Sequence, residues 1–190
     1  MRYKATIDFD GTAYCGWQIQ PNALSVQEVI QTQLSLILRE KIEVVGCGRT
    51  DAGVHARNYV LHFDTQKDLP ENFLYRFNQI LPRDIASQEV VQIRNDFHAR
   101  FDAVKRSYVY YIHGLKNPFL DGRSLLLGRM GDLDLDEIQK ACVVLLSSDE
   151  FAPFCKAHSD AKTMKCIIHK CEWVFDEEEG GCLEFHVSAN

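Results

Sequence analysis

The residues with the clearest potential for chemistry lie in a glycine-rich segment, Gly46–Ala56, which runs between two apolar stretches. Arg49 and Asp51 stand two positions apart, so in an extended loop their side chains point to the same side and can form an ion pair. A guanidinium lowers the pKa of a neighbouring carboxyl group and keeps it ionised, as a carboxylate nucleophile requires. The structural alternative is an Asx-turn, in which the Asp51 side chain bonds the nearby backbone.

A second group of reactive side chains lies closer to the C-terminus. Its members are Cys155, His158, Cys166, His169 and Cys171. Four ligands of these types would suit zinc in a loop-rich segment. However, residues 166–175 alternate like a strand, so Cys166 and His169, three apart, would point to opposite faces and could not bind one ion together. We therefore expect buried cysteines here and no metal.

The formal net charge of −6 is unevenly distributed along the chain. Residues 91–129 carry seven basic and three acidic side chains, a balance of +4, between two acidic flanks. This segment is suited to binding phosphate groups, and a solvated charged face is the alternative. Its basic residues include Arg94, Arg100, Lys105 and Arg106.

The composition, with 46% hydrophobic and 25% charged residues, is that of an ordinary globular protein. No apolar stretch approaches the ~20 residues of a membrane helix, and the N-terminus does not read as a secretory signal. We expect a soluble cytoplasmic protein whose seven cysteines are reduced.

The segments around Gly46–Ala56 predict the elements that hold it. Residues 2–9 alternate between apolar and polar side chains, as in a half-buried strand. Ser25 and Glu28 form a capping box for a helix, and Asp134 and Glu137 do the same for a second helix that ends at Ser147. The apolar faces of these helices are Val26, Val29, Ile30, Leu34, Ile37 and Leu38, and Leu135, Ile138, Cys142, Leu145 and Leu146. Further strands are expected at 42–46, 58–64, 88–93 and 106–113, a short helix at 71–79, and a hairpin of 166–175 and 182–189 with its turn at 177–181. Helices and strands without strict alternation indicate an α+β fold.

The segment Gly48–Ala56 resembles the signature of TruA-type tRNA pseudouridine synthases. The resemblance continues in the same order along most of the chain. Its other segments are Asp8–Gly11 with Tyr14, Gly16–Gln18, Ser25–Glu28, His62–Phe63, Asn78 with Leu81–Ala86, Phe97–Phe101, and Arg106 with Tyr108 and Tyr110. This match identifies the chain as a member of that family.

The resemblance implies an isomerase that converts uridine to pseudouridine in the anticodon stem-loop of tRNA, at positions 38–40. Asp51 would be the catalytic aspartate, Tyr108 would stack on the uracil, and Arg49 would pair with Asp51 and hold the flipped nucleotide. Lys105, Arg106, Arg94 and Arg100 are candidates for contacts with the tRNA backbone, whereas His55 and His98 are expected to be structural. Because the reaction involves no net redox change or hydrolysis, neither a metal nor another cofactor is expected. The family also implies a homodimer.

The family fold implies two related halves around a central cleft, here 1–105, with the catalytic loop 46–56, and 106–190. The match stops at Ala189–Asn190, where family members continue into an apolar helix, so we expect an incomplete second half. That expectation keeps open an alternative, a non-catalytic RNA-binding module. A zinc-dependent base deaminase is rejected, because its His-x-Glu and Pro-Cys-x-x-Cys motifs do not occur.

Overall fold

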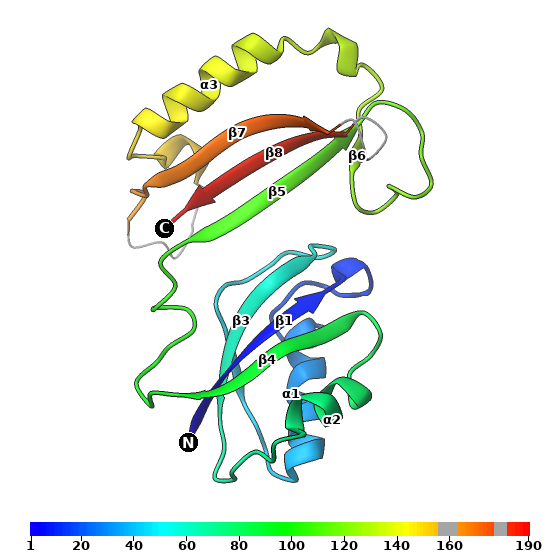
Figure 1. Ribbon diagram of the computed structural model, residues 1–190. Helices are drawn as coiled ribbons and strands as arrows, with labels where there is room; N and C mark the ends of the chain where they lie inside the picture. Colours follow the sequence, from blue (N-terminus) through cyan, green and yellow to red (C-terminus); the bar gives the residue numbers. More distant parts are fainter. Residues whose placement is uncertain (156–162, 177–181) are drawn as a thin grey trace. The chain divides into compact units, whose positions relative to one another are not determined.

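The structure is a computed structural model, and it describes residues 1–155, 163–176 and 182–190. The chain divides into two compact units, Met1–Ala103 and Val104–Asn190, and each contains one four-stranded sheet (Figure 1). The predicted α+β class is confirmed, because helices and strands mix and most strand pairs are antiparallel. No helix in the described part of the chain combines the length and the apolarity of a membrane span.

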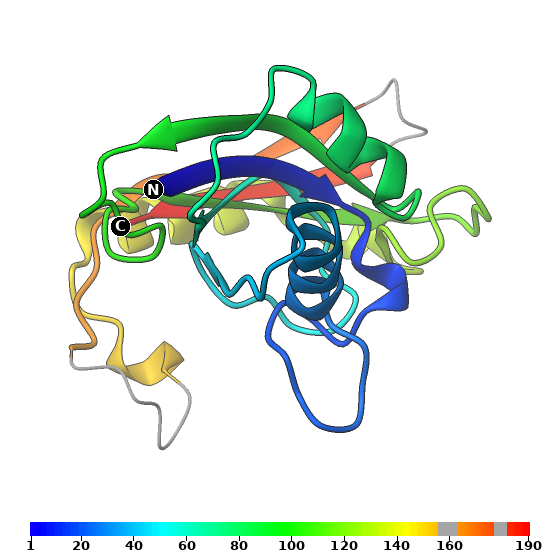
Figure 2. The same cartoon turned by 90° about the horizontal axis from the view of Figure 1, so that it is seen from below.

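The sheet of the first unit has the strand order β2-β3-β1-β4, with every neighbouring pair antiparallel. Its strands are β1 (Arg2–Phe9), β2 (Val44–Gly46), β3 (Ala56–Asp64) and β4 (Ile85–Ile93). The helices α1 (Val26–Leu38) and α2 (Phe73–Ile80) pack beside this sheet and enclose one continuous apolar core with it (Figure 1, Figure 2). A short 3-10 helix, η1 (Gly11–Ala13), follows β1.

The predicted patterns of β1 and α1 are confirmed. Every second residue of β1 is buried, namely Tyr3, Ala5, Ile7 and Phe9. The Ser25 hydroxyl accepts the Glu28 N–H at 3.3 Å and so caps α1, an interaction typically worth ~1 kcal/mol. The buried stripe of α1 consists of Val26, Ile30, Leu34 and Leu38. Burial of each such side chain contributes roughly 1.5–3 kcal/mol, so the core, more than local helix propensity, fixes this unit.

The second unit has the strand order β6-β5-β8-β7. Its elements are β5 (Arg106–His113), β6 (Leu125–Leu126), α3 (Leu135–Ser147), β7 (Ile168–Asp176) and β8 (Cys182–Ala189), with two 3-10 helices, η2 (Met130–Asp132) and η3 (Ala152–Phe154). β5, β8 and β7 pair antiparallel, whereas β6 runs parallel to β5. The two strands of the predicted C-terminal hairpin are present, and its turn at 177–181 lies outside the described residues.

In the second unit one strand was missed and one expectation was wrong. The strand β6 was not predicted, because two leucines carry no alternation that a pattern could detect. The predicted buried face of α3 is also too wide, since Leu135 and Leu146 are 47% and 43% exposed and only Cys142 is fully buried. The reason is that α3 packs against β7, so the sheet covers a narrow stripe of the helix (Figure 1).

Candidate active site

The segment Gly46–Ala56, here called the Asp51 loop, leaves β2 and returns into β3. The two strands pair from Val44 to Gly46, and the Cys47 N–H extends the pairing by donating to the Val60 carbonyl at 2.8 Å. Beyond this point the loop is held by the chain that follows β1. Trp17 N–H donates to the Thr50 carbonyl, and Gly53 N–H donates to the Tyr14 carbonyl, both at 3.2 Å. The two loops are therefore bonded through their backbones.

Two glycines after β1 are required by this close approach. A Cβ on Gly11 would lie 2.0 Å from the Val54 carbonyl oxygen, and one on Gly16 would lie 2.3 Å from the Thr50 carbonyl oxygen. Gly16 also has a φ of +80°, in the left-handed region that other residues rarely adopt. Side chains at these positions would push the loops apart.

Aromatic side chains anchor the start of the Asp51 loop. Tyr59 lies 4.3 Å from the Trp17 ring and 5.6 Å from the Phe9 ring, measured between centroids, and all three are buried. The Tyr59 hydroxyl donates to the Gly48 carbonyl. Its oxygen would also lie 2.2 Å from a Cβ on Gly46, so only glycine fits there. The polar end of a core tyrosine thus fixes the path of the loop.

The end of the Asp51 loop is held by His55. Its Nδ1 accepts the Gly11 N–H at 3.2 Å and lies 3.1 Å from an Asp10 carboxylate oxygen. The same Asp10 oxygen accepts the Thr12 N–H at 3.0 Å and so caps η1. His55 therefore makes the structural hydrogen bonds expected of it.

Asp51 itself is exposed and presents its carboxylate to solvent. In the part of the chain that the structure describes, its side chain makes no hydrogen bond, and it forms no ion pair with Arg49. The expected pairing fails because the loop is not extended: Val54 N–H donates to the Asp51 carbonyl at 3.3 Å, and Gly53 has a φ of +79°. The Asx-turn alternative is also absent, since the turn at Asp51 is closed by its backbone carbonyl and not by its side chain. The carboxylate is left available to a ligand.

Tyr14 and Asp84 add a link that the sequence did not suggest as a pair. The Tyr14 hydroxyl donates to the Asp84 carboxylate at 2.8 Å, and the Asp84 carbonyl accepts the Asp10 N–H at the same distance. Burial and this hydrogen bond raise the pKa of Tyr14, so its hydroxyl stays protonated as a donor. The start of β4 is thereby bonded to the loop that supports Asp51.

A second overlooked contact lies where the Asp51 loop enters β3. Asn58 has a positive φ of 55°, uncommon for a residue other than glycine, and its N–H donates to Asp8 at 2.7 Å. The other Asp8 carboxylate oxygen accepts the side-chain amide of Gln88 at 2.9 Å. The β1–β3 register shifts between Ile7 and Phe9, so Asp8 stabilises an irregularity in the sheet beside the site. No sequence pattern marks such a bulge.

Tyr108 belongs to the second unit, where it lies on β5. On β5, Tyr108 pairs opposite Val187, and Tyr110 pairs opposite Phe185. Tyr110 forms an aromatic row with Phe185 and Trp173, at centroid distances of 6.2 and 4.7 Å. Tyr108 is half-exposed and makes no ring contact among the described residues. The structure therefore distinguishes two tyrosines that alternation alone could not separate.

The four basic residues predicted to contact a nucleic-acid backbone have different surroundings. Arg94 donates to Asp102 at 2.8 Å and lies 3.5 Å from Asp96, so these carboxylates compensate its charge. Arg100 is exposed, with its guanidinium carbon 5.9 Å from the centroid of the Phe101 ring. Lys105 is exposed, and Arg106 begins β5.

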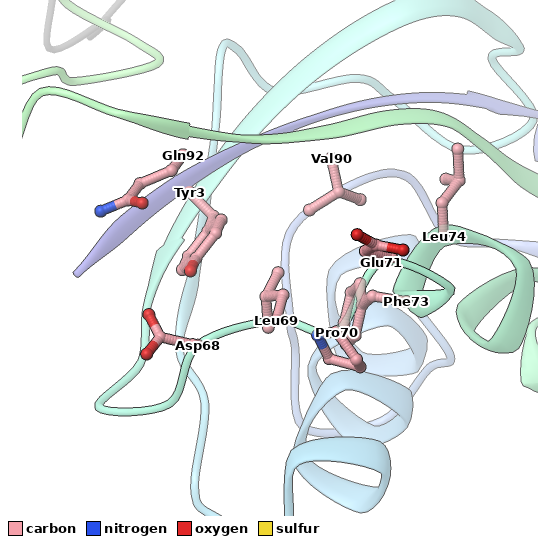
Figure 3. Close-up of a pocket in the computed structure, with 9 residues that line it drawn as sticks. All are labelled: Tyr3, Asp68, Leu69, Pro70, Glu71, Phe73, Leu74, Val90 and Gln92. Carbon is pink, nitrogen blue, oxygen red and sulfur yellow. The ribbon is translucent and has the colours of Figure 1, made fainter.

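The pocket described for the first unit does not include Asp51. A shallow pocket of about 360 Å³ lies near the start of β1, between Tyr3, Val90 and Leu69, with the carboxylates of Asp68 and Glu71 at its lining (Figure 3). Among the described residues, no group of three or more histidine, cysteine or acidic side chains is arranged to hold a metal ion. His158, one of the candidate zinc ligands, lies outside them, so the absence of zinc stays a prediction.

Comparison with known proteins places this site in a family. Residues 5–102, which include the Asp51 loop, match a family profile described as tRNA pseudouridine synthase. Proteins named tRNA pseudouridine synthase A are similar over most of the chain. The relative from Porphyromonas gingivalis is 41% identical over 91% of this chain and 69% of its own length. The relative from Bacteroides thetaiotaomicron is 42% identical over 100% of this chain and 70% of its own length. The relative from Exiguobacterium sibiricum is 35% identical over 94% of this chain and 71% of its own length. The chain belongs to the tRNA pseudouridine synthase family.

Proposed function

We propose that this chain isomerises uridine to pseudouridine in the anticodon stem-loop of tRNA, at positions 38–40, with Asp51 as the catalytic residue. The observation that carries the proposal is the exposed carboxylate of Asp51, which has no partner among the described residues and stands on a loop that is hydrogen-bonded to β3 and to the segment after β1, within the family match. A fixed carboxylate without a protein partner is free to interact with a substrate.

The proposed reaction is an isomerisation, so it requires a catalytic group and a pocket for the detached base but no second substrate. The C1′–N1 bond of uridine breaks, the uracil turns, and C5 joins C1′; N1 gains a proton and C5 loses one, so no redox partner is needed. Asp51 acts at the sugar or the base during the exchange, while the pocket retains the detached uracil. The substrate base must first leave its stack, which costs a few kcal/mol.

Residues from both halves share the remaining work in this proposal. The N-terminal half, 1–105, supplies the Asp51 loop, and the C-terminal half, 106–190, supplies Tyr108, whose half-exposed ring stacks on the flipped uracil. Arg49 is not paired with Asp51 in the free protein, so its guanidinium can bind the phosphate of the flipped nucleotide. Lys105, Arg106, Arg94 and Arg100 contact the tRNA backbone, and Arg94 must exchange its ion pair with Asp102 to do so. The enzyme works as a homodimer in the cytoplasm.

Tritium release from C5-labelled uridine in an unmodified tRNA transcript tests the proposal directly. Wild-type protein is expected to release tritium, because C5 loses its hydrogen when it joins C1′. Asp51→Asn keeps the size of the side chain, so we expect a folded protein that binds tRNA and releases none. Asp68→Asn, which changes an exposed acidic residue of the same unit at the pocket near the start of β1, is the control. Full turnover by Asp51→Asn would remove Asp51 from the mechanism, and tRNA binding without release by the wild type would favour a non-catalytic RNA-binding module.

A further inference from the structure

The segment Phe97–Asp102 packs against part of the first sheet, at His62 and Arg2, on the face opposite the helices. His62 points to this face, since its neighbours Leu61 and Phe63 belong to the helix-side core. Ala99 N–H donates to His62 Nδ1 at 3.1 Å, and Arg2 donates to the Phe97 carbonyl at 2.7 Å. His62 is buried beneath this cover, and burial, with a smaller effect from the charge of Arg2, lowers its pKa to about 4. The imidazole is neutral at pH 7.

Four rings form a ladder outward from the sheet. Phe97 and His62 are 6.0 Å apart between centroids, His62 and His98 are 5.0 Å apart, and His98 and Phe101 are 4.2 Å apart. Phe101 is the last ring and is 75% exposed. The guanidinium of Arg100 lies over it. The ring series thus passes over the buried His62 and ends at Phe101, which faces solvent.

The backbone around Phe101 is fixed despite this exposure. His98 Nδ1 accepts the N–H groups of both Arg100 and Phe101, at 3.2 and 3.3 Å. The Asp102 carboxylate accepts the His98 N–H at 3.1 Å and also bonds Arg94. Single exposed apolar residues are common on proteins and need no explanation. Here, however, hydrogen bonds fix the backbone that carries the exposed ring, and the ring itself contacts His98, so less conformational entropy is lost when a ligand stacks on it.

The surroundings of Phe101 suit a nucleic acid. The chain from 91 to 129 carries a balance of +4, with Arg100 next to the ring and Lys105 a few residues on. The two nearby carboxylates, Asp96 and Asp102, are both engaged by Arg94. An aromatic face beside cationic side chains is the combination with which proteins stack the bases of single-stranded nucleic acid.

We propose that Phe101, with Arg100 beside it, is a stacking site for an unpaired base of the RNA, separate from the Asp51 loop. The inference rests on the proposed function, which makes RNA the substrate, and adds a second point of contact to it. His62, under the ladder, lies six residues along β3 from Ala56, where the Asp51 loop ends. That distance is roughly 20 Å at ~3.3 Å per residue, whereas the start of the same loop lies beside His62, which pairs with Val45. Asp51 lies near the Ala56 end, since Gly53, two residues after it, donates to the Tyr14 carbonyl beyond β1. The stacked base therefore belongs to a part of the RNA that flanks the target uridine.

Binding of fluorescein-labelled, unmodified tRNA transcript tests the site, with all variants made in an Asp51→Asn background so that no turnover occurs. Phe101→Ala is expected to weaken binding roughly tenfold, as for the loss of one stacked base. The slope of log K against log salt should stay unchanged, because the ring neutralises no phosphate. Phe154→Ala, which removes a ring of similar exposure (77%) from the second unit and lies outside the basic segment 91–129, is the matched control and should bind like its parent.

Phe101→Trp provides a direct readout that a merely structural role would not give. It should retain the affinity, and stacking of a base on the indole should quench the added fluorescence relative to the parent, which has only Trp17 and Trp173. Affinity of Phe101→Ala within twofold of its parent, or unquenched Phe101→Trp at saturation, overturns the stacking site alone. Phe101-dependent binding without tritium release by the wild type overturns only the proposed reaction. A parent that binds no tRNA overturns both.

Discussion

The two units of the molecule bury their apolar side chains to very different extents. In the first unit, α1, α2 and all four strands share a continuous core in which Phe77 and Ile30 are completely inaccessible. In the second, Cys142, Cys171 and Leu183 are buried, but Tyr110 is 59% exposed and Val144 of α3 is 63% exposed. Both units therefore have a four-stranded sheet, but the first encloses a buried core and the second leaves apolar side chains exposed. The Asp51 loop stands on the closed core.

The open face of the second unit has a defined shape. The aromatic row of Tyr110, Phe185 and Trp173 lines a hollow of about 650 Å³, together with Leu125 and Phe154. The comparison shows that the regular strands of this unit are held mainly by sheet hydrogen bonds and by α3 on β7, whereas the first unit adds extensive burial of apolar area. The position of the Asp51 loop is thus supported by a buried apolar core, and the second unit has no comparable core among its described residues.

Truncating one phenylalanine in each unit should give the largest difference in stability between the two units. Phe77→Ala opens a cavity in the closed core, and we expect a loss of about 3–5 kcal/mol in the free energy of unfolding. Phe175→Ala, at a ring that is 53% exposed, should lose less than about 1 kcal/mol. Urea unfolding followed by circular dichroism measures both. Equal losses would show that the second core is as closed as the first.

A pair of glycines with positive φ sharpens the comparison at the level of loops. Gly16→Ala combines an unfavourable φ of +80° with a Cβ in contact with the Thr50 carbonyl, and should cost roughly 2–4 kcal/mol. Because that clash displaces the Asp51 loop, tritium release should also fall by more than tenfold. Gly122→Ala, in the second unit, has a φ of +73° but open space around its Cβ, so only roughly 1–2 kcal/mol should be lost. Unimpaired turnover by a folded Gly16→Ala protein would contradict the role of the backbone contact.

The buried histidine of the first unit predicts a dependence of stability on pH. His62 has a pKa of about 4 when folded and ~6.5 when unfolded, so the unfolded chain binds more protons between these values. Its contribution is complete above pH 6.5 and is lost as the pH falls towards 4, by up to about 3 kcal/mol. Thermal unfolding in a series of buffers from pH 7 to pH 4 measures this. In His62→Gln, which retains an acceptor for the Ala99 N–H but does not titrate, that part of the pH dependence should disappear; an unchanged profile would exclude His62 as its source.

The same contrast explains which features could be predicted from the sequence. The alternation of β1 and the capped stripe of α1 gave the right elements because, in the first unit, the apolar face that a sequence presents is the face that becomes covered. In α3 an equally apolar pattern overestimated burial, since periodicity reports which side chains are suited to a core but not how much structure packs on them.

In the candidate site too, some features could be predicted from the sequence and others could not. The motif located Asp51, but the absence of its ion pair with Arg49 depends on a turn that begins at Asp51 itself. The bond between Tyr14 and Asp84 joins residues seventy positions apart, and such contacts leave no local signal. Long-range hydrogen bonds of this kind are decided by the assembled fold.

The backbone bonding between the Asp51 loop and the loop after β1 has a consequence for sequence variation. Because Trp17 N–H, Gly53 N–H and their carbonyl partners belong to the main chain, the identity of most neighbouring side chains is irrelevant to that contact. A library of substitutions should therefore be permissive at exposed Thr12 and Ala13 and intolerant at Gly11 and Gly16. Insertions of even one residue should be excluded throughout, since they would change the spacing of the donors. The two loops should therefore tolerate changes in most residue identities but not in the number of residues.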